Sequence, residues 1–328
     1  MFRKVLITLI TLITLTALLT AVSPAQAAQK LILGHVGVRD SAHELAATTV
    51  ITQIERRLPG RFKIENKGGS TLGGEVDIWE GMKLGTVDLA ILTTGAITPS
   101  VPPLGVLSVP FLFRDADHAG EVLNGPIGQE LGVSLEPHGV IFLGFAEHGF
   151  RHLSNSRRPV QRPEDIAGLR IRVIPNPIYE MTFKALGAEV VPMAWPTVYG
   201  ALDDGRIDGQ ENPLLTFSGS HFERVQKHLT LTGHIYSGLV IVVNAEIYHK
   251  MLPDERLALR EAAHTAGVET RPILVARDQA IVAELREKGV AVVESVDRPA
   301  FVKAVESLWP EWEKRFGANL LQRIRETQ

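Results

Sequence analysis

The chain alternates twice between short apolar runs and helical patterns, and this alternation is the feature that most limits its fold. Runs with the apolar content or the period of strands are each followed by a segment with helical spacing. Strands separated by helices predict an α/β unit with parallel or mixed strands. In the first unit, the predicted strands are 30–36, 61–67 and 87–92, and the predicted helices are 41–58 and 75–84.

A second set of alternating strand-like and helix-like segments follows a proline-rich connection at 99–110 and a predicted strand at 140–147. Two α/β units joined by strand crossings place a ligand cleft between them, near strand ends and helix starts. Periodicity alone does not distinguish a binding protein from a two-domain enzyme. In this second unit the predicted strands are 170–174, 189–191 and 236–244, and the predicted helices are 178–186, 196–202, 253–288 with a break or kink at Pro272, and 298–315.

The start of the chain has the pattern of a secretory signal peptide. A short cationic segment precedes an uncharged run over 5–22, and Ala25 and Ala27 provide the small residues that a signal peptidase requires. The alternative is an uncleaved membrane anchor, because the uncharged run is just long enough to span a bilayer. We expect cleavage after Ala27 and export of a soluble mature protein.

Composition narrows the chemistry that the chain can perform. It has no cysteine, so disulfides, thiolate metal sites and cysteine nucleophiles are excluded. A net charge of −3 without a polybasic run argues against nucleic acid and anionic membrane surfaces as partners. We expect no cofactor and no metal, because His148 and His152 lack the HExxH order. The glycine-rich run at 68–74 is followed by Glu75 where a phosphate loop has lysine, so it predicts a turn.

Two arginines on one predicted strand carry the strongest chemical signal. Arg170 and Arg172 alternate with apolar residues, so both side chains lie on the same face of the strand. An arginine at the end of an interior strand must meet an anion, because burying it unpaired is very costly. On chemistry alone, Arg172 is either a structural ion pair or a ligand clamp. On the same basis Trp195 is a core residue and Asn212 a turn residue.

A set of short motifs also occurs in a fixed order. They are GFRHLSN at 149–155, GLRIRV at 168–173, VPMAW at 191–195, VYGAL at 198–202 and DGQENP at 208–213. Together they resemble the DctP-type solute-binding proteins of tripartite ATP-independent periplasmic (TRAP) transporters, and the similarity covers essentially the whole mature chain. The resemblance implies an α/β, two-lobed periplasmic-binding-protein fold, type II-like, with mixed sheets, a hinge and a long helix in the C-terminal half that spans both lobes.

The resemblance also implies which residues form the site. Arg172 matches the arginine that forms a two-pronged salt bridge with the ligand carboxylate, a geometry that lysine cannot provide. Arg151 matches a second basic contact, and Asn212 matches a ligand-facing amide. Trp195 matches an aromatic ring that stacks on the carbon frame of the ligand. In the first lobe, the positions that face the cleft in similar proteins are His35, Glu75 and Thr94.

The implied function is binding, not catalysis. A receptor of this kind captures a small organic carboxylate (a C4, keto or hydroxy acid, or a sugar acid), closes by a hinge and docks on a TRAP membrane permease. We expect a periplasmic monomer. The alternatives are a receptor of another transporter or sensor system and an exported two-domain hydrolase. The expected division is a signal peptide at 1–27, lobe I at 28–149 plus about 238–277, and lobe II at 150–237 plus about 278–328.

Overall fold

The computed structural model describes residues 28–328, so the predicted signal peptide lies outside the described residues. The strands are β1 (Gln29–Gly34), β2 (Phe62–Lys67), β3 (Leu89–Thr93), β4 (Val140–Asn155), β5 (Arg170–Val173), β6 (Glu189–Pro192), β7 (Gly209–Asn212), β8 (His228–Asn244) and β9 (Ala291–Val293). They form one mixed sheet of nine strands in the order β2-β1-β3-β8-β4-β7-β5-β6, with β9 paired to β8. No helix within 28–328 is both long and apolar enough to cross a membrane.

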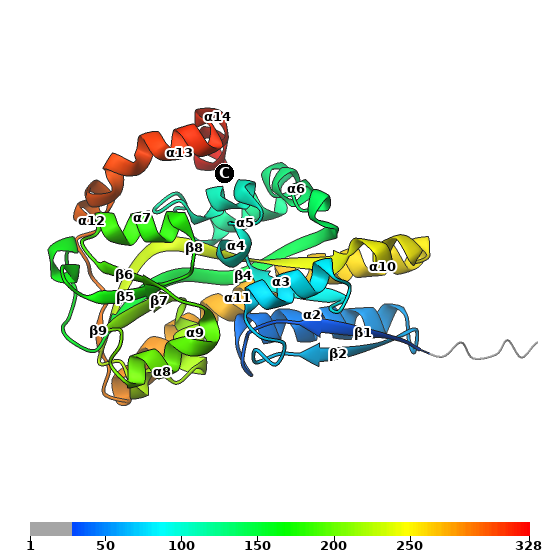
Figure 1. Cartoon of the computed structure of the whole chain (residues 1–328), viewed down its shortest axis with the longest axis horizontal. Coiled ribbons are helices and arrows are strands. Elements are labelled where there is room, and N and C mark those ends of the chain that lie inside the picture. Colours follow the sequence, from blue (N-terminus) through cyan, green and yellow to red (C-terminus); the bar gives the residue numbers. More distant parts are fainter. Residues whose placement is uncertain (1–27) are drawn as a thin grey trace, which may run out of the picture.

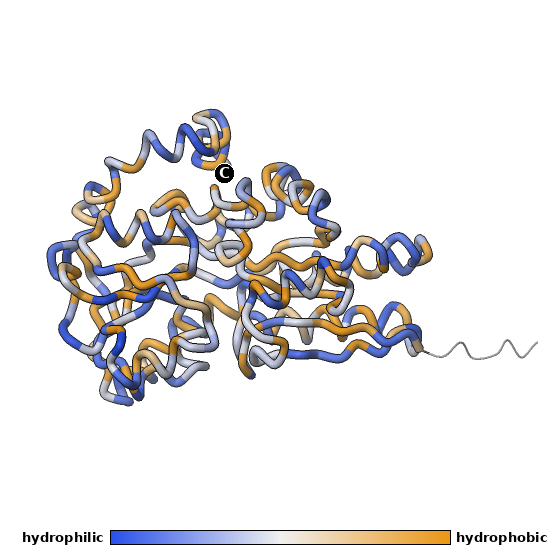
Figure 2. The backbone as a smooth tube through the Cα atoms, in the orientation of Figure 1, coloured by the Kyte–Doolittle hydropathy of each residue, from blue (hydrophilic) through white to orange (hydrophobic). Residues whose placement is uncertain are grey.

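Helices pack on both faces of this sheet (Figure 1). Hydrophobic residues are concentrated along the central strands, whereas hydrophobic and hydrophilic residues alternate along the outer helices (Figure 2). The α-helices are α2 (Ala42–Arg57), α3 (Glu75–Lys83), α4 (Thr94–Ile97), α5 (Ala116–Asn124), α6 (Pro126–Val133), α7 (Pro177–Ala185), α8 (Val198–Asp203), α9 (Leu214–Gly219), α10 (Ala245–Lys250), α11 (Pro253–Glu287), α12 (Arg298–Val305), α13 (Trp309–Phe316) and α14 (Ala318–Glu326).

The central strands are buried on both sides, which explains their continuous apolar sequence. Along β3, Leu89 and Ile91 point into a core cluster that includes residues of α2 and α11. The alternate residues, Ala90 and Leu92, point into a second cluster that includes residues of α3 and α5. Successive side chains of a strand point to opposite faces, so a strand covered by helices on both faces needs no polar alternation.

Two long antiparallel strands connect the two lobes. β4 has 16 residues and β8 has 17. β3 pairs with the C-terminal half of β8, whereas β7 pairs with the C-terminal half of β4, so the lobes share these two strands. The predicted strands at 140–147 and 236–244 are therefore too short. Their missing halves bury polar side chains such as Arg151, whose counter-ion Glu211 lies on a neighbouring strand.

Most predicted helices are confirmed, and two differ from their predictions. α11 runs without interruption from Pro253 to Glu287 with Pro272 inside it, so the helix does not break there, and the kink that was the alternative stays a prediction. The single helix predicted at 298–315 is instead divided into α12 and α13 by a short 3-10 turn at Glu306–Leu308. Pro310 lies in the first turn of α13, where its missing N–H needs no partner, and this favours a new helix start.

The C-terminal helices pack away from the lobe to which the sequence assigned them. Trp312, Leu321 and Ile324 are buried in the cluster formed mainly by the segment 28–149 and the end of β8. The ring of His118 also hydrogen-bonds the carbonyl of Ile324 at 2.7 Å. In Figure 1 these helices run across the top of the molecule toward α5 and α6. We therefore propose a lobe division in which α13 and α14 belong to lobe I.

The middle of the crossing strands departs from regular pairing. The β4–β8 register shifts between Glu147 and Gly149, and Gly149 has a φ of +106, which only glycine adopts readily. Glu147 is buried here, and its Oε2 lies 3.4 Å from Nε of Arg271 on α11. Its Oε1 has no hydrogen-bond partner among the described residues. Burial raises the pKa of Glu147 to about 7 although Arg271 opposes the shift.

We predict that Glu147→Gln changes the pH dependence of stability. Unfolded glutamate ionises near pH 4.3, so stability from the protonated buried group is complete below that pH and is lost as pH rises to about 7. Glutamine does not titrate, so the variant should gain stability relative to the wild type between pH 5 and pH 8. Thermal unfolding followed by circular dichroism measures the difference. Glu164→Gln, at an exposed position, is the control. If the stability difference between Glu147→Gln and the wild type is the same at pH 5 and at pH 8, the raised pKa of Glu147 is refuted.

Candidate ligand-binding site

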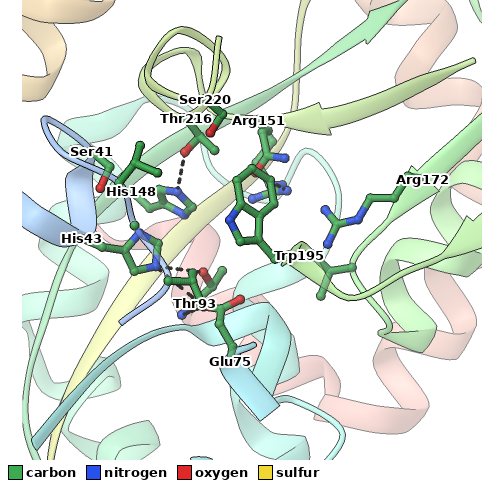
Figure 3. A pocket seen from close by; sticks show the side chains of 15 residues that line it. Ser41, His43, Glu75, Thr93, His148, Arg151, Arg172, Trp195, Thr216 and Ser220 are labelled. Carbon is green, nitrogen blue, oxygen red and sulfur yellow. Dashed lines mark hydrogen bonds and ion pairs between the residues drawn. The ribbon is translucent and has the colours of Figure 1, made fainter. Parts of the chain in front are cut away.

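A partly enclosed cavity lies between the lobes, beside the crossing strands. Clefts between lobes are common ligand-binding sites. Figure 3 shows that its side chains come from the loop after β1, from α3 and β3, and from β4, β5, β7 and α9. The lining residues are Val36, Gly37, Val38, Ser41, His43, Glu75, Thr93, His148, Arg151, Arg172, Ile174, Trp195, Asn212, Thr216 and Ser220.

Arg172 contributes a buried guanidinium that has no acidic partner. It lies in β5 with only 2% of its surface exposed, and its Nε donates to the carbonyl of Met193 at 2.9 Å. Its Nη1 has no hydrogen-bond partner among residues 28–328. Burial lowers the pKa of Arg172 to about 10, although Glu211 opposes the shift, so the group remains charged at neutral pH. The cavity therefore contains a cation that forms no ion pair with any carboxylate of residues 28–328.

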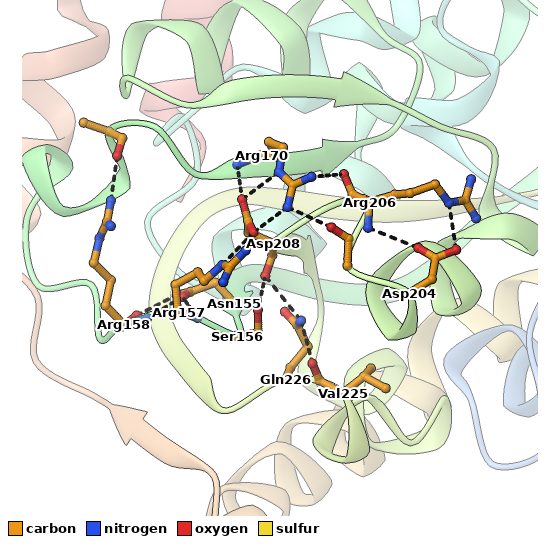
Figure 4. A network of polar contacts seen from close by, with 12 residues as sticks. Asn155, Ser156, Arg157, Arg158, Arg170, Asp204, Arg206, Asp208, Val225 and Gln226 are labelled. Atoms are coloured by element: carbon orange, nitrogen blue, oxygen red, sulfur yellow. Dashed lines mark hydrogen bonds and ion pairs between the residues drawn. The ribbon is translucent and has the colours of Figure 1, made fainter.

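Arg170, on the same strand, has the opposite environment. Its Nε and Nη2 donate to the carboxylate of Asp208 at 3.0 and 2.8 Å, and Arg157 donates to the same carboxylate at 2.8 Å (Figure 4). Hydrogen bonds from Arg170 hold the pKa of Asp208 well below its usual range, although burial opposes them. Arg170 is thus the structural ion pair, and it anchors the start of β5. Arg172, two residues further along, is left for another anion.

Arg151 on β4 is fully buried and already neutralised. Its Nε and Nη2 donate to the two carboxylate oxygens of Glu211 at 2.5 and 2.9 Å. Nη2 also donates to Oδ1 of Asn212 at 3.0 Å, whereas Nη1 has no partner among the described residues. Burial raises the pKa of Glu211, but the charge of Arg151 outweighs it, so that the pKa lies below its usual value. The sequence contained Glu211 within its DGQENP motif, yet nothing identified it as this counter-ion.

Trp195 and Asn212 complete the second-lobe wall. The indole is half-buried, its ring centre lies 5.8 Å from Cζ of Arg172, and it packs at 5.7 Å against the ring of Phe222. Asn212 ends β7 and donates through Nδ2 to the side chain of Gln210. All four second-lobe residues that the resemblance indicated, Arg172, Arg151, Trp195 and Asn212, therefore line one cavity.

Glu75 is the acidic residue of the first-lobe wall. It begins α3, and its Oε1 accepts a hydrogen bond from the backbone N of Thr93 at 2.6 Å and lies 3.7 Å from Nε2 of His43. Burial acts to raise the pKa of Glu75, but the contacts with His43 and Thr93 outweigh it and hold that pKa below its usual value. The cavity therefore presents a carboxylate at neutral pH.

Two of the predicted first-lobe residues do not line the cavity. His35 is fully buried behind His43, and its Nε2 lies 2.8 Å from Oδ1 of Asn66. Thr94 is also buried, and its neighbour Thr93 faces the cavity instead. Consecutive residues at a strand end point to opposite sides, so an assignment that is wrong by one position places the side chain in the core.

The sequence analysis did not identify most of the uncharged residues that line the cavity. Ser41 and His43 lie at the start of α2, after the loop that follows β1, and ligands of α/β folds bind where strands end and helices begin, so that signal could have found them. His148 is held by Ser237 at 3.1 Å and Thr216 at 3.0 Å, and burial lowers its pKa well below its usual value, so the ring is neutral. Within 28–328, no group of three histidine, aspartate or glutamate side chains is arranged to hold a metal.

Two contacts join the lobes outside the cavity lining. Nδ2 of Asn176 donates to the carbonyl of Gly95 at 2.8 Å, next to the ring of Tyr179. A Cβ added to Gly74 would lie 3.6 Å from Cδ of Pro196. Residues of the two lobes are therefore in direct contact in this structure.

The fold and the site define a two-lobed ligand-binding protein with a buried cation in its cleft. Residues 33–315 match the family described as "Bacterial extracellular solute-binding protein, family 7" (DctP). The chain is 34% identical over 305 residues to the 2,3-diketo-L-gulonate-binding periplasmic protein of Escherichia coli strain K12, covering 92% of this chain and 93% of that one.

Solved structures give the same result. A TRAP periplasmic solute-binding protein from Polaromonas sp. JS666, bound to D-erythronate, is 36% identical with a TM-score of 0.89, and the match covers 92% of this chain and 99% of that one. A Bordetella protein of the same kind, with density assigned to pantoate, is 38% identical with the same TM-score and coverage. The chain belongs to this DctP family of TRAP-transporter solute receptors.

We predict that Asp208→Asn destabilises the protein without removing the ligand site. It weakens the charged hydrogen bonds that anchor β5 and β7, each of which contributes about 1–3 kcal/mol. The free energy of unfolding in urea should fall by about that amount. Asp204→Asn is the matched control, because its exposed pair with Arg206 contributes little. Equal effects of the two substitutions would contradict the structural role of Asp208.

Proposed function

We propose that this chain is a periplasmic receptor that binds a small organic carboxylate between its lobes and delivers it to a TRAP permease. The observation that carries this proposal is the guanidinium of Arg172, which has no acidic partner among residues 28–328 and lines the cavity between the lobes. A buried charge without a partner is costly, and an anionic ligand of matching shape removes that cost. A carboxylate suits a guanidinium because it accepts two parallel N–H donors.

The neighbouring groups define how such a ligand is held. The Nη1 atoms of Arg172 and Arg151 have no acceptor among residues 28–328, so both can donate to the ligand carboxylate. The amide of Asn212 lies beside them, and the indole of Trp195 provides an apolar surface for the ligand's carbon frame. The named ligands of the relatives, 2,3-diketo-L-gulonate, pantoate and D-erythronate, are small organic carboxylates and support this choice.

The rest of the proposal follows from the family. The receptor is exported through the cleavable signal at 1–27, acts as a monomer by binding rather than by catalysis, and presents its closed form to the permease. Closure is the step that a ligand favours, because only the closed form brings side chains of both lobes into contact with it.

Arg172→Ala should abolish carboxylate binding and leave the fold intact. Truncating one partner of a desolvated charged pair costs about 2–5 kcal/mol, and Arg172→Lys should recover only part of that loss because it lacks the planar fork. Calorimetric titration with a panel of organic and sugar acids measures the affinity, and circular dichroism checks the fold. Arg206→Ala on the surface is the control. Near-normal affinity of Arg172→Ala would sink the clamp assignment.

Ligand binding should also change the fluorescence of Trp195. Its indole lines the same cavity as Arg172, with its ring centre 5.8 Å from Cζ of that arginine, so an anion that binds the guanidinium alters the field at the ring. Titration of the wild type should change the emission, and Trp195→Phe should remove most of that change while Trp309→Phe retains it. An unchanged signal in Trp195→Phe would place the reporter elsewhere.

A further inference from the structure

The cavity has groups of opposite charge on its two walls. Arg172 and Arg151 come from the strands of one wall, and Glu75 comes from the start of α3 on the other. Figure 3 shows the Glu75 carboxylate and the Arg172 guanidinium on different sides of the same space, with the Trp195 ring beside it. A ligand that fills this space therefore meets donors at one end and an acceptor at the other.

Glu75 is held as a carboxylate but is not neutralised by a lysine or an arginine. Its Oε1 accepts from Thr93 N at 2.6 Å, and its basic neighbour is the ring of His43 at 3.7 Å. Its Oε2 accepts no hydrogen bond from any residue in 28–328. An ionised carboxylate can only accept hydrogen bonds, so a ligand group beside Oε2 must be a donor.

This requirement excludes a second carboxylate at that end of the ligand. Two like charges in a water-excluded cavity repel each other strongly, and such contacts suppress wrong partners. A ligand ammonium would also donate, but moving a second ligand charge out of water costs more than moving a hydroxyl. The remaining polar wall is neutral, with the hydroxyls of Ser41, Thr216 and Ser220 and the uncharged ring of His148. A hydroxyl group fits this surface best.

We propose, on the basis of the proposed function, that Glu75 makes the site selective for hydroxylated monocarboxylates over dicarboxylates. The ligand carboxylate binds Arg172, and a hydroxyl toward the far end of the ligand donates to Oε2 of Glu75. Because the two groups belong to different lobes, selection takes place as the cleft closes. A dicarboxylate of equal length pairs with Arg172 but resists closure.

The test compares D-erythronate with succinate, which has the same number of carbon atoms but a second carboxylate in place of the hydroxyls. Calorimetry measures both affinities for the wild type and for Glu75→Gln, which keeps the size of the side chain and an acceptor for Thr93 N. The wild type should favour D-erythronate, and Glu75→Gln should reduce the ratio of the two affinities by about tenfold or more. Glu44→Gln, outside this cavity, should leave the ratio unchanged.

Each outcome separates the two proposals. If the wild type binds succinate as tightly as D-erythronate, or if Glu75→Gln leaves the ratio unchanged, the selectivity of Glu75 is refuted and the receptor function stands. If 4-aminobutanoate binds more tightly than D-erythronate, the hydroxyl assignment is refuted. If no hydroxylated, keto, sugar or dicarboxylic acid in the panel binds the wild type, the receptor function itself fails. The wild-type comparison remains decisive even if Glu75→Gln does not fold.

Discussion

The site is built around one buried guanidinium, that of Arg172, which has no acidic partner among residues 28–328. Burying Arg172 without an internal acid is unfavourable, and the rest of the fold must hold it there. Its two basic neighbours are treated differently, because Arg170 is paired with Asp208 and Arg151 with Glu211. Those two ion pairs link β5 to β7 and β7 to β4, so they also fix the strands on which the site depends. The fold thereby leaves the unpaired charge at the one position where a ligand can reach it.

Closure and selectivity share a common cause in this architecture. β4, β8 and α11 are the long elements between the lobes, and the pairing of β4 with β8 is irregular at Glu147 and Gly149. Arg172 and Glu75 lie on opposite sides of that connection, so their separation is set by how far the lobes close. A ligand that satisfies both groups stabilises the closed form, whereas a ligand that satisfies only Arg172 does not.

Much of the fold was predictable, and the errors have specific physical reasons. The strands and helices of the first unit follow from apolar periodicity, because those strands are covered by helices on both faces. Half of β4 and half of β8 escaped prediction because they bury polar side chains such as Arg151, whose counter-ion Glu211 lies on a neighbouring strand. A different limit affected the site: Thr94 was chosen although Thr93 faces the cavity, because consecutive residues at a strand end point to opposite sides and the sequence does not show where the strand ends.

The sequence by itself determined the α/β order and the family motifs, and through them four of the second-lobe residues of the cavity and Glu75. Local propensity and motif order are properties of the sequence, so they can be recognised without a structure. Only the tertiary structure decided that Arg170 is neutralised while Arg172 is not, although both lie on one face of one strand. That difference depends on where Asp208 and Glu211 lie in space, and the pairing of distant strands, not the local sequence, sets those positions.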